Sequence, residues 1–271
     1  MGARRLSTSI IKLHTPLGDT VSIIPEVTAT CRHFYENLYS RGEVNNSKQT
    51  SLLSHLTTSL SLSEAKELDS VISPEEVAKA IQDSALGSSP GQDGIPFEFY
   101  KAFTHILSPF LASMYTNLLN GGSLPSSTSQ SMITLIFKNK GSELDLRNWR
   151  PISLLNCDRK LLTKILPTRL QHVASSLIHP SQTGFIKGRL ISENTMVITQ
   201  ILDYYHHSPQ TGALVFLDQE KAYDRVDWSY LFQCLKAMHF GPKFIKIIQD
   251  LHSGLNSSVR VNGFCSISFT T

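Results

Sequence analysis

Two carboxylates stand close together in the sequence, directly after a run of apolar residues. Asp218 follows residues 214–217 (Leu-Val-Phe-Leu), and Asp224 comes six residues later. The apolar run is bounded by Pro209 and Gly212 and is rich in β-branched and aromatic side chains, so it predicts a buried strand. A carboxylate at the end of such a strand is costly to bury unless it pairs with a cation or binds a metal. Asp218 is therefore a candidate metal ligand, and a helix-capping aspartate is the alternative.

Four blocks of sequence occur in a specific order. Three of them are Ser-Pro-Gly-Gln-Asp-Gly-Ile-Pro at residues 89–96, Asn-Trp-Arg-Pro-Ile-Ser-Leu-Leu at 148–155 and Gln-Thr-Gly-Phe-Ile-Lys-Gly-Arg at 182–189. The fourth is Asp-Gln-Glu-Lys-Ala-Tyr-Asp-Arg-Val at residues 218–226. Each block alone is a modest signal, but the series closely resembles the reverse transcriptases of non-LTR (LINE-like) retrotransposons.

The resemblance implies RNA-templated DNA synthesis, in which a primer hydroxyl attacks the α-phosphorus of a deoxynucleoside triphosphate. Two Mg²⁺ ions assist such a reaction, and Mg²⁺ prefers oxygen ligands. By this resemblance, Asp218 supplies one ligand through its carboxylate and Gln219 another through its main-chain carbonyl. Tyr223 would lie beneath the incoming sugar and disfavour a 2′-hydroxyl. A tyrosine packed beside the strand is the alternative.

Arg150 matches, by the same resemblance, an arginine of the fingers that binds the triphosphate. A guanidinium suits this role because it can bind two phosphate oxygens at once. Residues 132–137 and 149–155 predict the two strands of a hairpin, so Lys138 or Lys140 near its tip would be the companion cation. Solvated basic side chains on a hairpin are the alternative.

The third block resembles the segment that lies along the template strand. The residues implied as template-binding are Gln182, Gly184, Phe185, Gly188 and Arg189. Glycines allow a close approach of the backbone to a nucleic acid, and an aromatic side chain can stack on a base. Phe185 could equally be a core residue.

The charge distribution is consistent with a phosphate-bearing partner. Residues 130–189 contain ten Lys or Arg and three Asp or Glu, within a chain whose formal net charge is +3. Such a basic block is typical of nucleic-acid-binding proteins, although a solvated basic face would have the same composition. The expected partners are an RNA template, a DNA primer and deoxynucleoside triphosphates.

Sequence patterns predict the elements that must position these residues. Helices are expected over residues 27–39, from Pro74 with Ser73 as N-cap, over 97–119 with a break near Pro109, over 158–176 and 194–205, after the N-cap Asp227, and from Pro242. Asn262-Gly263 predicts a two-residue turn in a hairpin over residues 258–269. The fold class expected is α+β: right-hand polymerase fingers and a partial palm over residues 71–271, preceded by a helical segment over 1–70.

The sequence lacks the aromatic-Ala-Asp-Asp block that follows in the family. We therefore expect a truncated reverse transcriptase, lacking the second metal-binding carboxylates and inactive alone. A non-catalytic nucleic-acid-binding fragment and a non-functional relic are alternatives. A Mg²⁺-dependent phosphohydrolase with Asp218 as nucleophile is a third, less favoured one.

Composition narrows the cellular setting. No apolar run approaches the roughly 20 residues that a membrane span requires, and no apolar core of signal-peptide length follows the N-terminal basic residues. The four cysteines, Cys31, Cys157, Cys234 and Cys265, are far apart and form no Cys-x-x-Cys pair. We expect an intracellular protein, nuclear or cytoplasmic, without disulfides and without membrane association.

Overall fold

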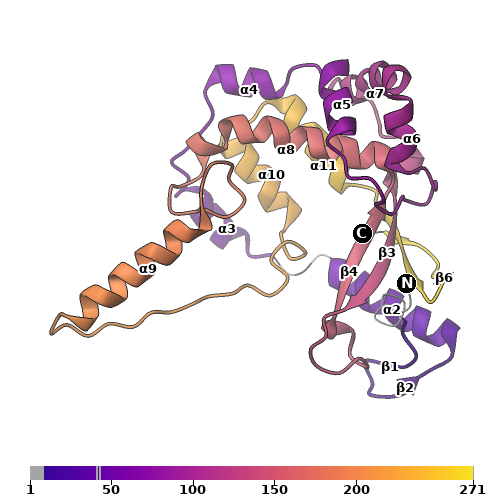
Figure 1. The fold of residues 1–271 in the computed structure, drawn as a ribbon, viewed down its shortest axis with the longest axis horizontal. Coiled ribbons are helices and arrows are strands. Elements are labelled where there is room, and N and C mark those ends of the chain that lie inside the picture. The colour runs from indigo at the N-terminus through magenta and orange to yellow at the C-terminus, as the bar shows by residue number, and fades with distance from the viewer. Residues whose placement is uncertain (1–8, 41, 43, 271) are drawn as a thin grey trace. The chain divides into compact units, whose positions relative to one another are not determined.

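The structure is a computed structural model, and it describes residues 9–40, 42 and 44–270 (Figure 1). The chain forms two compact units. The sheet unit comprises the described residues of Met1–Val44, Val71–Ile165 and Pro242–Thr271. The helical unit comprises Asn45–Ser70 and Leu166–Gly241. Residues 9–40 belong to the same unit as the sheet.

The sheet unit is built on a mixed five-stranded sheet. Its strands are β3 (Gln130–Phe137), β4 (Trp149–Leu155), β5 (Asn256–Val261), β6 (Phe264–Cys265) and β7 (Phe269–Thr270). The order is β4-β3-β5-β6, and β7 also pairs with β5. The β3–β4 pair is antiparallel, whereas β3 and β5 run parallel. Both predicted hairpins are confirmed, and the second turns at Asn262 and Gly263 with φ angles of 50° and 92°.

The N-terminal segment is part of the core of this sheet. It contains β1 (Leu13–His14), β2 (Thr20–Val21) and α2 (Ile24–Tyr39), and the last of these confirms the helix predicted over residues 27–39. Cys31 and Tyr35 of α2 pack in one buried cluster with Ile133, Trp149 and Val259 of the sheet. Figure 1 shows α2 lying against the strands. Burial of this apolar face, rather than local propensity, stabilises the helix.

Four further helices and the first part of a fifth belong to the sheet unit. They are α5 (Pro74–Gln82), α6 (Phe97–Ala102), α7 (Thr104–Leu119), α11 (Pro242–His252) and the start of α8 (Cys157–Leu177). Ser73 caps α5, as the sequence predicted, and the structure shows that it also forms a capping box with Glu76. The start of α8 is fixed by the buried guanidinium of Arg159, which donates to the carbonyl oxygens of Thr128, at 2.7 Å, and Leu251.

The break predicted near Pro109 is wrong in position. The chain leaves helical geometry at Phe103, where φ is −111° and ψ is 24°, and Pro109 lies inside α7. A proline inside a helix removes one main-chain hydrogen bond. The burial of Leu111, Tyr115 and Leu118 just after it offsets this loss.

The helical unit contains α3 (Asn46–Leu53), α4 (Leu62–Leu68), the rest of α8, α9 (Ile191–His206) and α10 (Trp228–Ala237). Asp227 caps α10 by accepting from the main-chain nitrogen of Tyr230 at 2.8 Å, as predicted. Arg169 of α8 donates to the carbonyl oxygens of Leu68 and Ser70, at 3.2 and 2.7 Å. These contacts tie α4 to α8 within the unit.

The strand predicted over residues 214–217 is wrong. These residues form no helix or strand, and the exposed fractions of Leu214, Val215, Phe216 and Leu217 are 43%, 73%, 76% and 92%. A strand needs a neighbour for its main-chain hydrogen bonds, and the described part of the helical unit contains no strand. The apolar run is therefore an extended, uncovered segment here.

The structure thus contains both helices and a mixed sheet and is of the mixed α/β class. Among the described residues, no helix has both the length and the apolar character of a membrane span. All four cysteines are free thiols. Cys31 and Cys157 are buried, whereas Cys265 is exposed.

The cysteines are expected to differ sharply in reactivity. Burial raises the pKa of the Cys31 thiol to about 12 and that of Cys157 to about 11, so neither forms much thiolate at pH 8. Iodoacetamide at pH 8, followed by mass spectrometry, should label Cys265 and spare Cys31 and Cys157. Labelling of all four in guanidinium is the control, and native labelling of Cys31 as fast as Cys265 would contradict this packing.

Candidate functional site

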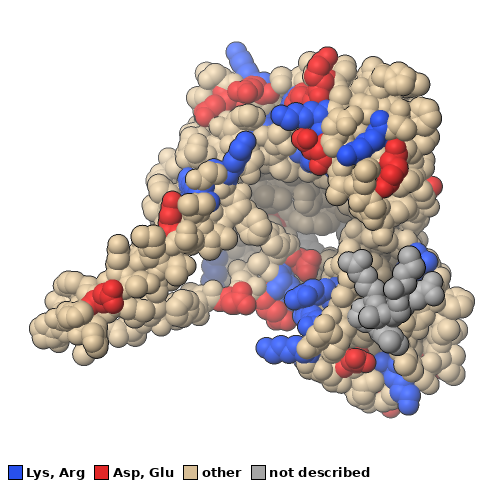
Figure 2. Space-filling model, viewed as in Figure 1, with Lys and Arg blue, Asp and Glu red and all other residues tan. Residues whose placement is uncertain are grey.

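The basic residues of the 130–189 block are not equally available to a ligand. Arg159 and Arg169 are buried and bound to main-chain carbonyls. Lys160 donates to the carbonyl oxygen of Ser89 at 2.8 Å. On the face seen in Figure 2, Lys and Arg side chains are interspersed with Asp and Glu and form no single continuous patch. The block therefore has a smaller exposed charge than its composition suggests.

Several of the exposed cations of the sheet unit lie on the β3–β4 hairpin. Arg150 pairs with Ile136 across the strands, and Trp149 pairs with Phe137. Because side chains alternate along a strand, the burial of Trp149 places Arg150 on the opposite face of the hairpin. Lys138, Lys140 and Arg150 are all exposed. In the part of the chain that the structure describes, no carboxylate forms an ion pair with Lys140 or Arg150.

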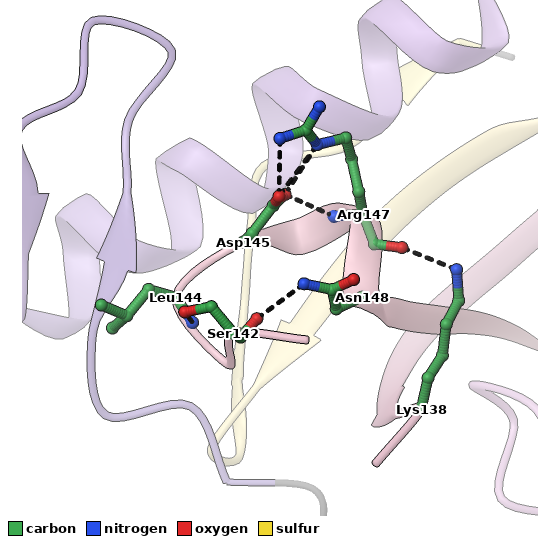
Figure 3. Close-up of polar contacts among 6 residues, drawn as sticks. All are labelled: Lys138, Ser142, Leu144, Asp145, Arg147 and Asn148. Carbon is green, nitrogen blue, oxygen red and sulfur yellow. Dashed lines mark hydrogen bonds and ion pairs between the residues drawn. The ribbon is translucent and has the colours of Figure 1, made fainter. Parts of the chain in front are cut away.

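The connection between β3 and β4 is held by its own polar contacts (Figure 3). Arg147 donates from its Nε to Asp145 Oδ2 at 2.9 Å and forms an ion pair with it at 2.7 Å. These hydrogen bonds lower the pKa of the Asp145 carboxyl. Asn148 Nδ2 donates to the carbonyl oxygen of Ser142 at 2.9 Å, and Lys138 Nζ donates to that of Arg147 at 2.6 Å. The connection is held by its own hydrogen bonds, and Lys138 takes part in them.

Two contacts fasten this connection to the rest of the sheet unit. The main-chain nitrogen of His14 donates to the carbonyl oxygen of Leu144 at 2.8 Å. The indole nitrogen of Trp149 donates to the carbonyl oxygen of Glu143 at 2.9 Å. The ring centroids of Trp149 and Phe137 lie 5.3 Å apart. The hairpin that carries Arg150 and Lys140 is therefore held to the sheet unit by hydrogen bonds and ring packing.

The loop of the first sequence block packs on the junction between β4 and α8. A Cβ atom at Gly91 would lie 2.0 Å from Asn156 Oδ1 and 2.4 Å from the main-chain nitrogen of Asn156. Only glycine fits this approach. The side chain of Gln92 reaches the carbonyl oxygen of Ser131 and the hydroxyl of Ser258, each at 3.4 Å. The loop is thus fixed against both β3 and β5.

A groove of about 790 Å³ opens between this loop and the sheet. Many of its lining residues have small polar side chains, and Arg260 also lines it. The lining residues are Ser89, Pro90, Gly91, Gln92, Gly94, Gln130, Met132, Leu154, Asn256, Ser258, Arg260, Cys265, Ser266 and Ser268. No residue that the sequence singled out as a site residue lines this groove, although the first block itself pointed to the loop.

The predicted template-binding residues form one compact loop of the helical unit. Arg189 donates to the carbonyl oxygens of Ile178, His179 and Gln182, at 2.8, 2.7 and 2.8 Å. Its guanidinium thus caps the end of α8, a role that the sequence did not reveal. Gln171 binds the loop from α8, accepting from the main-chain nitrogen of Lys187 at 3.0 Å.

Phe185 stands out from this loop. Its side chain is 88% exposed, and its φ of 63° lies in the left-handed region that is strained for a non-glycine residue. A core position for Phe185, which the sequence left open, is therefore wrong. Gly188 also has a positive φ, of 83°. At Gly184, an added Cβ atom would meet no other atom within 4 Å. The loop holds an aromatic ring outward from a fixed backbone.

Asp218, Gln219 and Tyr223 lie in the exposed segment that follows residues 214–217. Tyr223 is 81% exposed, so it does not pack beside a strand. Within the described residues, no group of three or more His, Cys, Asp or Glu side chains could hold a metal ion. One carboxylate and one carbonyl oxygen do not make a two-metal site. Lys138, Lys140 and Arg150 lie in the sheet unit, and the other predicted site residues lie in the helical unit.

Comparison with known proteins gives a consistent result. Residues 137–267 match the family described as reverse transcriptase (RNA-dependent DNA polymerase). The "Transposon TX1 uncharacterized 149 kDa protein" of Xenopus laevis is 33% identical over 248 residues, which cover 92% of this chain and 18% of that protein. A Pol polyprotein from the retrotransposable element R2DM of Drosophila melanogaster is 26% identical, over 68% of this chain and 17% of its own length. The RNA-directed DNA polymerase from the mobile element jockey of the same species is 24% identical, over 73% of this chain and 22% of its own length. The chain spans about a fifth of these relatives.

The close approach at Gly91 makes a stability prediction. Gly91→Ala should lower the free energy of unfolding by about 2–3 kcal/mol, because the new methyl group overlaps the main chain of Asn156. Urea unfolding followed by circular dichroism measures the change. Gly184→Ala is the matched control, since its Cβ enters open space. Equal stability of the two variants would show that the loop does not dock as described.

Proposed function

The chain belongs to the reverse transcriptase family, in the group found in non-LTR retrotransposons, and from this premise we propose that it is the substrate-binding part of an RNA-directed DNA polymerase. The observation that carries the proposal is the β3–β4 hairpin. It presents an exposed arginine from an ordered base, in the sequence block where the resemblance places the fingers arginine.

Arg150 and Lys140 are the proposed contacts to the triphosphate. Both are exposed, and neither forms an ion pair in the described part of the chain. A guanidinium can bind two oxygens of one phosphate, and an ammonium adds a point charge. Lys138 is assigned a different role, because its amino group already donates to the hairpin connection. Holding the hairpin still reduces the loss of conformational freedom on binding.

The template is proposed to contact two surfaces, each within one unit. In the helical unit, Phe185 offers an exposed ring on which a base can stack. Arg189 and Gln182 support the loop from behind rather than contact the nucleic acid. In the sheet unit, the groove beside residues 89–94 offers hydroxyl and amide groups and the Arg260 guanidinium to ribose and phosphate. Tyr223, exposed and close in sequence to Asp218, is proposed to lie under the incoming sugar.

Asp218 is proposed as the first metal ligand of the polymerase centre, with the carbonyl oxygen of Gln219. When bound, Mg²⁺ would activate the primer hydroxyl and stabilise the leaving pyrophosphate. A two-metal centre needs further carboxylates, and the described residues gather no such group. We therefore propose that the 271-residue chain alone binds substrates without extending a primer.

Binding of the nucleotide should depend on the hairpin cations. Arg150→Ala should weaken binding of dTTP by about tenfold or more, because charge-assisted hydrogen bonds to phosphate are lost. Equilibrium dialysis with labelled dTTP measures this. Lys79→Ala, which removes an exposed charge from α5, is the control and should bind as the wild type. An unchanged affinity in Arg150→Ala would refute the proposed triphosphate contact.

This chain should bind nucleic acid without catalysing primer extension. Affinity for a fluorescent RNA–DNA primer-template should fall steeply between about 50 and 200 mM salt, because phosphate contacts release counterions. Phe185→Ala should weaken binding to single-stranded RNA by about tenfold through lost stacking. Primer extension with Mg²⁺ should yield no product. Robust incorporation would refute the inactivity, whereas affinity that does not change with salt would refute the nucleic-acid interface.

A further inference from the structure

Residues 211–219 form a stretch of the helical unit whose main chain has no hydrogen-bond partners. They belong to no helix or strand. Within the part of the chain that the structure describes, none of their main-chain nitrogens or carbonyl oxygens forms a hydrogen bond. Residues 213–217 (Ala-Leu-Val-Phe-Leu) are all apolar, and the only charge of the stretch is the carboxylate of Asp218. An uncharged apolar run with unpaired main-chain groups has the properties of a strand that lacks a neighbour.

Helix α9 precedes this stretch and is also uncovered. None of its 16 residues is buried. Val197, Ile201 and Tyr205 are spaced by four residues, so they lie along one face of the helix. The ring of Tyr205 lies beside Gly212, where an added Cβ atom would be 3.1 Å from it. The exposed apolar side chains of α9 are Ile191, Met196, Val197, Ile201, Leu202, Tyr204 and Tyr205.

The helix and the stretch together offer enough apolar surface for a stable interface. Typical side-chain areas, reduced to the exposed fractions of these residues, amount to on the order of 1,000 Å². A standard protein–protein interface buries about 800 Å² on each partner. An exposed apolar surface of this size is typical of an interaction site. A two-stranded ribbon is marginally stable in water unless a helix packs on it, and α9 is such a helix.

The charges beside the apolar run favour one arrangement of two copies. In a parallel, in-register pair, Asp218 would lie opposite Asp218 of the other copy, which is unfavourable. An antiparallel pair related by a two-fold axis places one residue opposite itself, because facing residues project from the same side of a sheet. With Val215 on this axis, residues 213–217 face only one another, and Asp218 faces Gly212. With Phe216 on the axis, Asp218 would face Leu214 instead.

We propose that this surface joins two copies of the chain. Residues 213–217 of the two copies pair as antiparallel strands around Val215, and α9 of each copy packs on the ribbon. The pairing gives hydrogen-bond partners to main-chain groups that have none in a single copy. It also covers the apolar run without opposing two carboxylates. The inference goes beyond the proposed function, and neither nucleotide binding nor primer extension enters its test.

Sedimentation velocity on the 271-residue chain should show a reversible monomer–dimer equilibrium between about 1 and 100 µM. Val215→Lys places two ammonium groups opposite each other on the axis, so it should weaken dimerisation by at least about tenfold. Val215 is exposed and its main chain forms no hydrogen bond, so the variant should unfold at the same temperature as the wild type.

Phe110→Lys is the matched control, because it also replaces an exposed apolar residue by a charge, on α7 of the sheet unit. It should dimerise as the wild type does. A wild type that remains monomeric at about 100 µM, or a Val215→Lys variant with wild-type dimerisation, would overturn the interface.

Cysteine cross-linking tests the register. In a Cys265→Ser background, Val215→Cys should form a disulfide between copies on mild oxidation, because directly opposite residues have Cα atoms about 4.5–5.5 Å apart. Phe216→Cys should cross-link much more slowly, since the two copies of residue 216 lie diagonally, about 7–8 Å apart. Equal rates for the two variants, or a faster rate for Phe216→Cys, would overturn the proposed pairing.

Discussion

The burial of Trp149 is the constraint on which the candidate nucleotide-binding surface depends. The indole packs in the core with Cys31 and Tyr35 of α2, and its nitrogen holds the carbonyl oxygen of Glu143. Because successive side chains of a strand point to opposite faces, this single anchored ring determines the direction of Arg150. The same ring fixes the register of β4 against β3. The apolar packing of Trp149 on one face of β4 thereby positions Arg150 on the other face. Helix α2 contributes to this orientation because Cys31 and Tyr35 pack in the same cluster as Trp149.

Local signals in the sequence predicted most of the elements. Ser73, Asp227, Pro242 and the Asn262-Gly263 pair each act within a few residues, and the structure confirms all of them. The strand over residues 214–217 failed for a physical reason. An apolar run forms a buried strand only when other residues cover its side chains and a neighbouring strand accepts its main-chain hydrogen bonds. Both depend on the rest of the chain and cannot be read from the run itself.

The roles of individual side chains were harder to predict than the elements. Arg189 and Lys138 have the residue type expected for contacts with phosphate, but both donate to main-chain carbonyls. Nothing in a sequence distinguishes a guanidinium that holds a loop from one that awaits a ligand, because the acceptors are carbonyl oxygens that every residue has. Phe185 shows the opposite case. Its exposure could not be read from its neighbours, yet it leaves the aromatic ring available for stacking.

The parallel pairing of β3 with β5 has a consequence for biosynthesis. Ser131 and Ser257 meet through their hydroxyls at 2.7 Å although 126 positions separate them in the chain. On the ribosome, α2, β3 and β4 are made long before β5. Their apolar face lacks Val259, Val261 and Phe269 until those residues have been made. Contacts between distant segments form slowly, and an uncovered strand edge invites association. During this interval the nascent chain exposes an apolar face and an unpaired strand edge, which are features that chaperones bind.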